Sequence, residues 1–205
     1  MATTLDSFRP QVQAEVPACP AIVIDGAIRD ACRTIAWDTW AVRSDIPVTT
    51  IADTQSYTLS APADHEVIAV KSVVMGGDTL LTPYSGSVPA SVRLIMRSGT
   101  PQAFWYRAGN LWLYPVPTDV RTLVAEAVIQ PTRTAATVDD RFLNYAEAIG
   151  YWALYRLKAA TGQAWTDEAG ARFNYQRYAD ITLDIRTAFD TSGTSGSRRV
   201  CTNFF

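Results

Sequence analysis

The sequence contains few of the residues that usually carry catalysis or bind metals. It has one histidine, His65, in the segment PADHE, and three widely separated cysteines, Cys19, Cys32 and Cys201. No C-x-x-C pair, H-E-x-x-H signature or aspartate-rich calcium loop is present, so no metal site is predicted. No serine stands in a G-x-S-x-G motif, and any nucleophile would have only His65 as its base. We therefore predict reduced thiols, no cofactor and no enzymatic activity, with a hydrolase that uses His65 as an alternative.

A strong net charge and a long apolar run are also missing. The formal net charge is −2, from 18 basic and 20 acidic side chains. This balance lacks the excess of basic residues that is typical of nucleic-acid-binding domains. No run of 18 apolar residues could span a bilayer, and the first twenty residues lack the basic and apolar regions of a signal peptide. We expect a protein made in the cytoplasm of its host, with no membrane partner.

The paired carboxylates of the sequence have a simple structural explanation. Glycoside hydrolysis needs two carboxylates across a cleft, and two such pairs are present, at residues 139–140 and 167–168. Both pairs stand where a helical pattern begins. Acidic side chains at these positions cap the helix or interact favourably with its N-terminal partial charges. We therefore expect helix capping at both pairs.

Apolar residues recur at helical spacing in three segments. The first runs from Pro20 to Val42, the second from after residue 140 to Gly162, and the third from Thr166 to about residue 190. The apolar stripe predicted for the third helix is Ala171, Tyr175, Tyr178, Ile181, Ile185 and Ala188. None of these helices can bury its stripe alone, so packing of all three together is expected.

Between the first and second helices, the pattern is typical of strands. Residues 46–131 contain alternating β-branched and aromatic segments that are separated by turn signals, and Pro131 ends the last of them. The predicted fold class is α+β: an antiparallel bundle of about three helices with an inserted, sandwich-like antiparallel β module. The expected divisions are residues 1–45, 46–131 and 132–190, followed by 191–205 as a linker and flexible C-terminal arm.

The segments AFWYR (residues 103–107) and NLWLY (residues 110–114) indicate an aromatic β-hairpin. Successive side chains of a strand point to opposite faces. Trp105 therefore points away from Phe104 and Tyr106. On the returning strand, Leu111 and Leu113 face away from the aromatic side chains Trp112 and Tyr114.

Rings on both faces suit a hairpin that lies between a core and a second surface. That surface is either another subunit or partner, contacted by Trp105, Trp112 and Tyr114, or a ligand such as a host glycan. Platforms for single-stranded nucleic acid usually interleave rings with several basic side chains, and only Arg107 is near. We therefore interpret the outer rings as a subunit or partner contact, with a glycan-binding module as the alternative.

The last fifteen residues combine a Gly/Ser-rich linker, residues 191–197, with the segment RRVCTNFF. Aromatic side chains are uncommon in disordered tails. We expect residues 198–205 to form a docking arm in which Phe204, Phe205 and Val200 are buried on a partner, while Arg198 and Arg199 bind its carboxylates. The alternative is an arm that folds back on the helices of its own chain.

Several segments together resemble head–tail adaptor (connector) proteins of tailed bacteriophages. They are PACPAIVIDGAIRDACRTIAWDTWAVRSDIPVTT, SYTLSAP, PQAFWYRAGNLWLYPVP with VIQPTR, and the helix pair LNYAEAIGYWALYRLKAATGQAWTDEAGARFNYQRYADITLDIR. The resemblance implies a virion protein that forms a ring, usually of twelve copies, beneath the portal. It further implies that the arm reaches the portal, that a tail or nozzle protein binds distally, and that DNA passes through as cargo. No catalytic residues are carried over.

Overall fold

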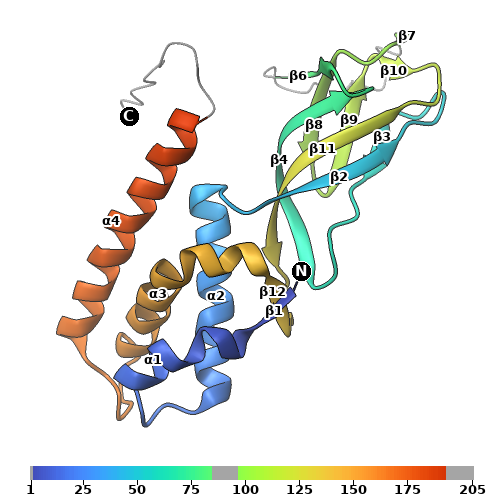
Figure 1. The fold of residues 1–205 in the computed structure, drawn as a ribbon. Helices are drawn as coiled ribbons and strands as arrows, with labels where there is room; N and C mark the ends of the chain where they lie inside the picture. The colour runs from blue at the N-terminus through green and yellow to red at the C-terminus, as the bar shows by residue number, and fades with distance from the viewer. Residues whose placement is uncertain (1, 85–96, 193–205) are drawn as a thin grey trace. The chain divides into compact units, whose positions relative to one another are not determined.

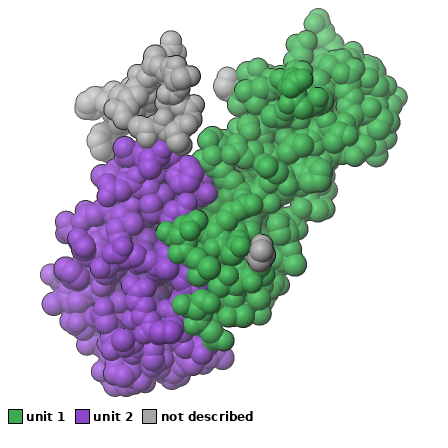
Figure 2. Space-filling view, viewed as in Figure 1, with its two compact units in different colours: residues 1–7, 42–144 green, residues 8–41, 145–205 purple. Residues whose placement is uncertain are grey.

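The computed structural model describes residues 2–84 and 97–192, which contain both helices and sheets (Figure 1). The predicted α+β class is therefore confirmed. The chain divides into two compact units (Figure 2). Unit 1 comprises Met1–Ser7 and Val42–Asn144, and unit 2 comprises Phe8–Ala41 and Tyr145–Phe205. The β-rich segment predicted at residues 46–131 falls entirely within unit 1.

Unit 1 contains two four-stranded sheets, which we name after a central strand of each. The β11 sheet has the strand order β2 (Arg43–Thr49), β11 (Thr122–Pro131), β4 (His65–Met75) and β5 (Thr79–Leu80). The β9 sheet has the order β3 (Ser56–Thr58), β9 (Asn110–Tyr114), β8 (Ala103–Arg107) and β6 (Thr82–Pro83). Two further short pairs are β1 (Ala2–Thr4) with β12 (Thr137–Asp139), and β7 (Ser98–Gly99) with β10 (Val116–Pro117).

The strand pairings are antiparallel, as predicted, with two exceptions. Strand β6 runs parallel to β8, and β7 runs parallel to β10. A parallel pair requires a long connection between its strands, and residues 84–102 supply one between β6 and β8. The alternation of apolar and polar residues predicts which face of a sheet a side chain occupies, but it does not predict which strands pair. The two parallel pairs were therefore not predicted.

The two hairpin turns predicted from the sequence are present. Between β8 and β9, Ala108 and Gly109 have φ angles of 49° and 83°. Successive positive φ angles are typical of the tight turns whose twist matches that of the flanking strands. Between β4 and β5, Gly76 and Gly77 also have positive φ angles, 62° and 92°. These turns fix the register of both hairpins.

One hydrophobic core is shared by the two sheets of unit 1. Its buried side chains come from both sheets and from the loops beside them: Ile46, Val48, Tyr57, Leu59, Val73, Met75, Leu81, Phe104, Leu111, Leu113, Leu123, Ala125 and Ala127. Burial alternates along β9 and along the first half of β11, so one face of each strand supplies the core. Over these stretches, the other face of each strand is less buried.

Unit 2 is formed by the four described α-helices. They are α1 (Arg9–Glu15), α2 (Ala21–Thr39), α3 (Ala146–Lys158) and α4 (Glu168–Ser192). A 3-10 turn, η3 (Asp140–Tyr145), precedes α3 and lies in unit 1 except for its last residue. Helix α2 packs against α3, which packs against α4, and α1 contacts both α2 and α3. The guanidinium of Arg9 binds the carboxylate of Asp25 with Nη2–Oδ2 at 2.8 Å, which ties α1 to α2.

The helix predicted from Pro20 to Val42 is shorter in the structure. Pro20 is the residue before the first helical turn, and the helix ends at Thr39, because Trp40 adopts a left-handed conformation with φ 53°. Helix α1 was not predicted, and neither was β1. Residues 1–20 are polar and proline-rich, a composition that favours irregular chain. Here Pro10 lies in the first turn of α1, where a missing N–H is tolerated.

The stripe predicted for α4 is only partly correct. Ala171 and Tyr178 are buried, but Tyr175 and Ala188 are exposed. The polar residues Asn174 and Thr182 are buried instead, and Thr182 Oγ1 donates to the carbonyl of Tyr178 at 2.9 Å. A hydroxyl that bonds to the preceding turn of its own helix can be buried at little cost, a possibility that an apolar pattern does not reveal.

Glu126 joins three strands on the face of the β11 sheet opposite the core. Its carboxylate accepts hydrogen bonds from Arg43 on β2 (3.0 Å) and Ser72 on β4 (2.9 Å). Burial would raise the pKa of Glu126, but these hydrogen bonds and the charges of Arg43 and Lys71 outweigh it, so the pKa lies below its ordinary value. The ionised carboxylate therefore stabilises the folded state.

Glu126→Gln should lower the free energy of unfolding at pH 7 by about 1 kcal/mol. Because the folded-state pKa is depressed, the advantage of the wild type is complete above the unfolded value of 4.5 and disappears as the pH falls below it. Urea unfolding of both proteins between pH 3 and 8 measures this convergence. The control Glu168→Gln, at a 78% exposed side chain, should show almost no loss. A wild-type advantage that persists unchanged at pH 3 would refute the assignment.

Candidate functional site

The outer face of the β9 sheet presents the aromatic side chains predicted from the hairpin. Phe104, Leu111 and Leu113 are buried in the core, which places Trp105, Trp112 and Tyr114 on the opposite face, where they are half-buried. The predicted alternation of the two strands is therefore present. Tyr106 shares the core face and donates its hydroxyl to the carbonyl of Val67 at 2.8 Å.

Three rings lie side by side across this face. Trp105 and Trp112 occupy directly opposite positions on β8 and β9, and their rings stack with centroids 5.8 Å apart and planes 10° from parallel. Tyr84, which follows β6, extends the row with its centroid 5.9 Å from that of Trp105. We name Tyr84, Trp105, Trp112 and Tyr114 the aromatic face. Sequence reasoning missed Tyr84, because its neighbourhood depends on the parallel β6–β8 pairing.

The surroundings of the aromatic face are polar and nearly uncharged. Beside Trp112 and Trp105, the next row across the sheet contains Thr58, Asn110 and Arg107. Thr58 Oγ1 donates to Asn110 Oδ1 at 2.9 Å. Arg107 is the one charged residue of the four strands in this sheet. A face of this composition buries rings without desolvating charges, which suits protein contact better than binding to a phosphate backbone.

His65 is held by the backbone on both sides of its ring. Nε2 accepts a hydrogen bond from the backbone N–H of Asp139 at 3.0 Å, and Nδ1 lies 2.7 Å from the carbonyl oxygen of Ala63. A neutral ring protonated on Nδ1 satisfies both contacts. These two contacts tie the start of β4 to β12.

An open hollow of about 580 Å³ lies in unit 1 between the β4–β5 turn and the segment before β11. Two carboxylates, Asp78 and Asp119, line it. Arg121 Nε donates to Asp119 Oδ2 at 2.9 Å, and this hydrogen bond lowers the pKa of Asp119. Within residues 2–84 and 97–192, no three His, Cys, Asp or Glu side chains come together as metal ligands.

The remaining predicted site residues are not placed by the structure. Arg198, Arg199, Val200, Phe204 and Phe205 of the expected docking arm lie outside the described residues. Of the three cysteines, Cys19 and Cys32 are described, and both are buried free thiols. Complete burial of Cys32 raises the pKa of its thiol, which disfavours the thiolate form.

Comparison with known proteins decides the family. The family model of the SU10 adaptor protein matches residues 3–200, which is nearly the whole chain. The chain belongs to this family of phage head–tail adaptors. No curated protein matches it. The resemblance drawn from the sequence motifs is confirmed at the level of the family.

Membership in the SU10 adaptor family gives the protein its general role. It is a structural component of the phage virion, and adaptors of this kind contact portal and tail proteins. None of the described helices is sufficiently long and apolar to cross a lipid bilayer. The aromatic face is one described surface whose composition fits contact with another protein.

Proposed function

We propose that this SU10-family adaptor assembles as a ring of twelve copies beneath the portal, joins the capsid to the tail, and conducts DNA. The match to the adaptor family over residues 3–200 carries this proposal. A net charge of −2 supports it, because a strongly basic lumen would retain passing DNA. The protein is made in the host cytoplasm and joins the neck of the virion, where a tail or nozzle protein binds its distal side.

The aromatic face is the proposed contact with a neighbouring copy in the ring. Trp105, Trp112 and Tyr114 stand on the side of the β9 sheet away from the core, and aromatic side chains are enriched at the centres of protein interfaces. In the proposed architecture, unit 1 is a sandwich-like module inserted into a helical bundle. The ring contact then completes the burial of rings that the sandwich leaves half-exposed.

The docking arm is the proposed contact with the portal. Residues 198–205 carry two arginines and two phenylalanines after a Gly/Ser-rich linker. Two phenyl rings need a hydrophobic pocket on the partner, and the arginines need carboxylates at its edge. The lower rim of the portal is the proposed site of both. The arm and the aromatic face therefore serve different partners.

A host glycan is the second candidate for the aromatic face. The observation that favours it is the row of three rings, Tyr84, Trp105 and Trp112, flanked by the amide of Asn110 and the hydroxyl of Thr58. Aromatic rings beside hydrogen-bonding groups suit pyranose rings, which have an apolar face and polar edges. Glycan binding that is lost on Trp112→Ala would support this candidate, whereas assembly lost on the same change supports the ring contact.

Light scattering with and without the portal tests the proposed assembly. The protein alone should scatter as a monomer of 22.5 kDa, because its ring contacts are expected to need the portal as a template. Addition of purified cognate portal should give a complex whose mass increases until the portal is saturated. A stable ring in the absence of portal would contradict template dependence, and no mass increase with portal would contradict the proposed function.

A further inference from the structure

The last turn of α2 ends in an unusual backbone conformation. Trp40 has φ 53° and ψ 25°, the left-handed region, which bulky residues rarely adopt. Its N–H bonds to the carbonyl of Ala36 at 3.1 Å. Thr39 Oγ1 donates to the carbonyl of Ile35 and accepts the N–H of Ala41 at 3.2 Å. The chain then passes from Ala41 to Val42, the first residue of this segment of unit 1.

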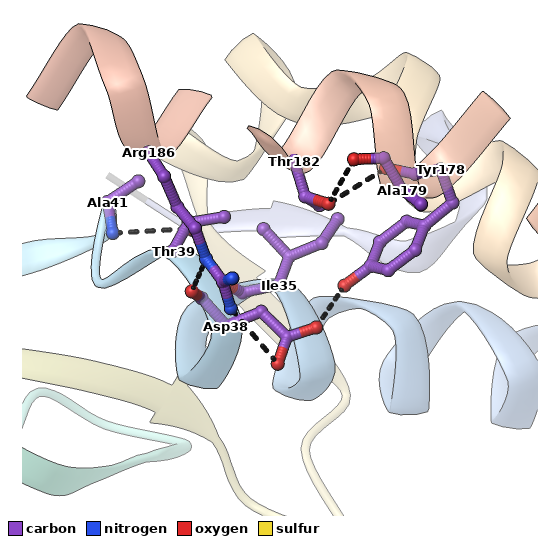
Figure 3. Close-up of polar contacts among 8 residues, drawn as sticks. All are labelled: Ile35, Asp38, Thr39, Ala41, Tyr178, Ala179, Thr182 and Arg186. Atoms are coloured by element: carbon purple, nitrogen blue, oxygen red, sulfur yellow. Dashed lines mark hydrogen bonds and ion pairs between the residues drawn. The ribbon is translucent and has the colours of Figure 1, made fainter. Parts of the chain in front are cut away.

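Two side chains of α4 hold the same turn through Asp38 (Figure 3). Tyr178 donates its hydroxyl to Asp38 Oδ2 at 2.7 Å. Arg186 donates through Nε to the backbone carbonyl of Asp38, and its Nη2 lies 3.8 Å from Asp38 Oδ1. The carbonyl of Asp38 lies at the C-terminal end of α2, where the carbonyl oxygens receive no hydrogen bond from an N–H of the same helix. Arg186 therefore supplies a hydrogen bond and a favourable positive charge at this helix end.

Tyr178 is held in place by burial against α3. It is 3% exposed, and the centroid of its ring lies 4.8 Å from that of Trp152 on α3. Burial raises the pKa of Tyr178, and the hydrogen bond to Asp38 with its negative charge raises it further. The phenol therefore stays protonated and remains a donor. Asp38 receives bonds from two residues that α4 presents on one face, eight positions apart.

We propose that Asp38, Tyr178 and Arg186 form a latch by which α4 holds the last turn of α2 and the left-handed bend at Trp40. Without the latch, the carbonyl of Asp38 loses its donor and the last turn of α2 is free to unwind. The bend then relaxes toward ordinary backbone conformations. All latch residues belong to α2 and α4, so the latch does not depend on the docking contacts proposed above.

Arg186→Met tests the latch, because methionine keeps much of the aliphatic length and removes every donor. Amide hydrogen exchange followed by NMR reports the bend directly, since the N–H groups of Trp40 and Ala41 are bonded within it. Exchange at these two amides should accelerate at least tenfold, while amides in the middle of α2 keep their rates. Tyr178→Phe, which removes one hydroxyl from a buried ring, should act in the same direction with a smaller acceleration.

The matched control is Arg172→Met on the same helix, where the side chain is 85% exposed. It should leave exchange at Trp40 and Ala41 unchanged. Unchanged exchange at the bend, or acceleration throughout α2, would overturn the latch.

Discussion

Leu113→Ala should lower the free energy of unfolding by about 3 kcal/mol, one of the largest effects expected of any single change in unit 1. Leu113 has no exposed surface and lies in the core between the two sheets, so truncation removes buried methyl groups and leaves a cavity. Urea unfolding followed by circular dichroism measures the loss. The secondary structure should remain, because the hairpin turn and the rest of the core are unchanged.

Trp112→Ala is the matched control, since Trp112 is the neighbour of Leu113 on the other face of β9. It removes the stack with Trp105 and should lower the free energy of unfolding by about 1 kcal/mol. Its main effect should fall on assembly, with fewer copies bound per portal. If Trp112→Ala destabilises the free protein as strongly as Leu113→Ala, the aromatic face belongs to the core of the monomer and is no partner contact.

Removal of residues 198–205 should abolish portal binding while the melting temperature stays nearly unchanged. Burial of two phenyl rings on a partner contributes roughly 3–6 kcal/mol before the cost of ordering the arm. Even the lower value corresponds to a loss of about a hundredfold in affinity. Titration of the truncated and full-length proteins against immobilised portal measures the difference, and calorimetry of both reports the stability.

Two substitution variants separate the parts of the arm. Phe204→Ala with Phe205→Ala should remove most of the affinity, whereas Arg198→Gln with Arg199→Gln should weaken binding less and reduce its salt dependence. An arm that folds back on its own helices predicts a different outcome, a lower melting temperature on truncation. Unchanged affinity of the truncated protein would equally exclude the arm as the portal contact.

The hairpin of β8 and β9 shows how far a sequence can predict a surface. Strict alternation assigned Trp105 and Trp112 to one face and Leu111 and Leu113 to the other, because the side-chain period of a strand is two residues. The stacking of the two tryptophans depends on register, which the turn at Ala108 and Gly109 fixes. The position of Tyr84 beside Trp105 could not be predicted, since it depends on a parallel pairing between segments far apart in the sequence.

For the helices, the sequence predicted the middle of an element better than its end. The apolar spacing predicted most of α2, but not the residue at which the helix ends. Trp40 adopts a left-handed conformation that glycine usually supplies, so no terminator stands at that position in the sequence. On α4, Asn174 and Thr182 are buried, whereas Tyr175, which the apolar pattern predicted to be buried, is exposed. The sequence did not predict the latch either, because Asp38 contacts Tyr178 and Arg186 only when α2 packs against α4.

The role of His65 also required the structure. In the sequence, a histidine in a turn is either solvated or a base, and the segment PADHE does not distinguish the two. Its contacts with Ala63 and Asp139 come from the loop before β4 and from β12, which are brought together by the fold. The two backbone contacts give His65 a structural role that the sequence pattern did not indicate.

Native mass spectrometry of the protein mixed with its purified cognate portal tests the proposed adaptor role most directly. The spectrum should show the portal ring carrying twelve copies of the 22.5 kDa subunit, with few partly loaded complexes once the protein is in excess. The protein alone should appear as a monomer. A portal that carries no copies under conditions in which both proteins are folded would contradict the proposal.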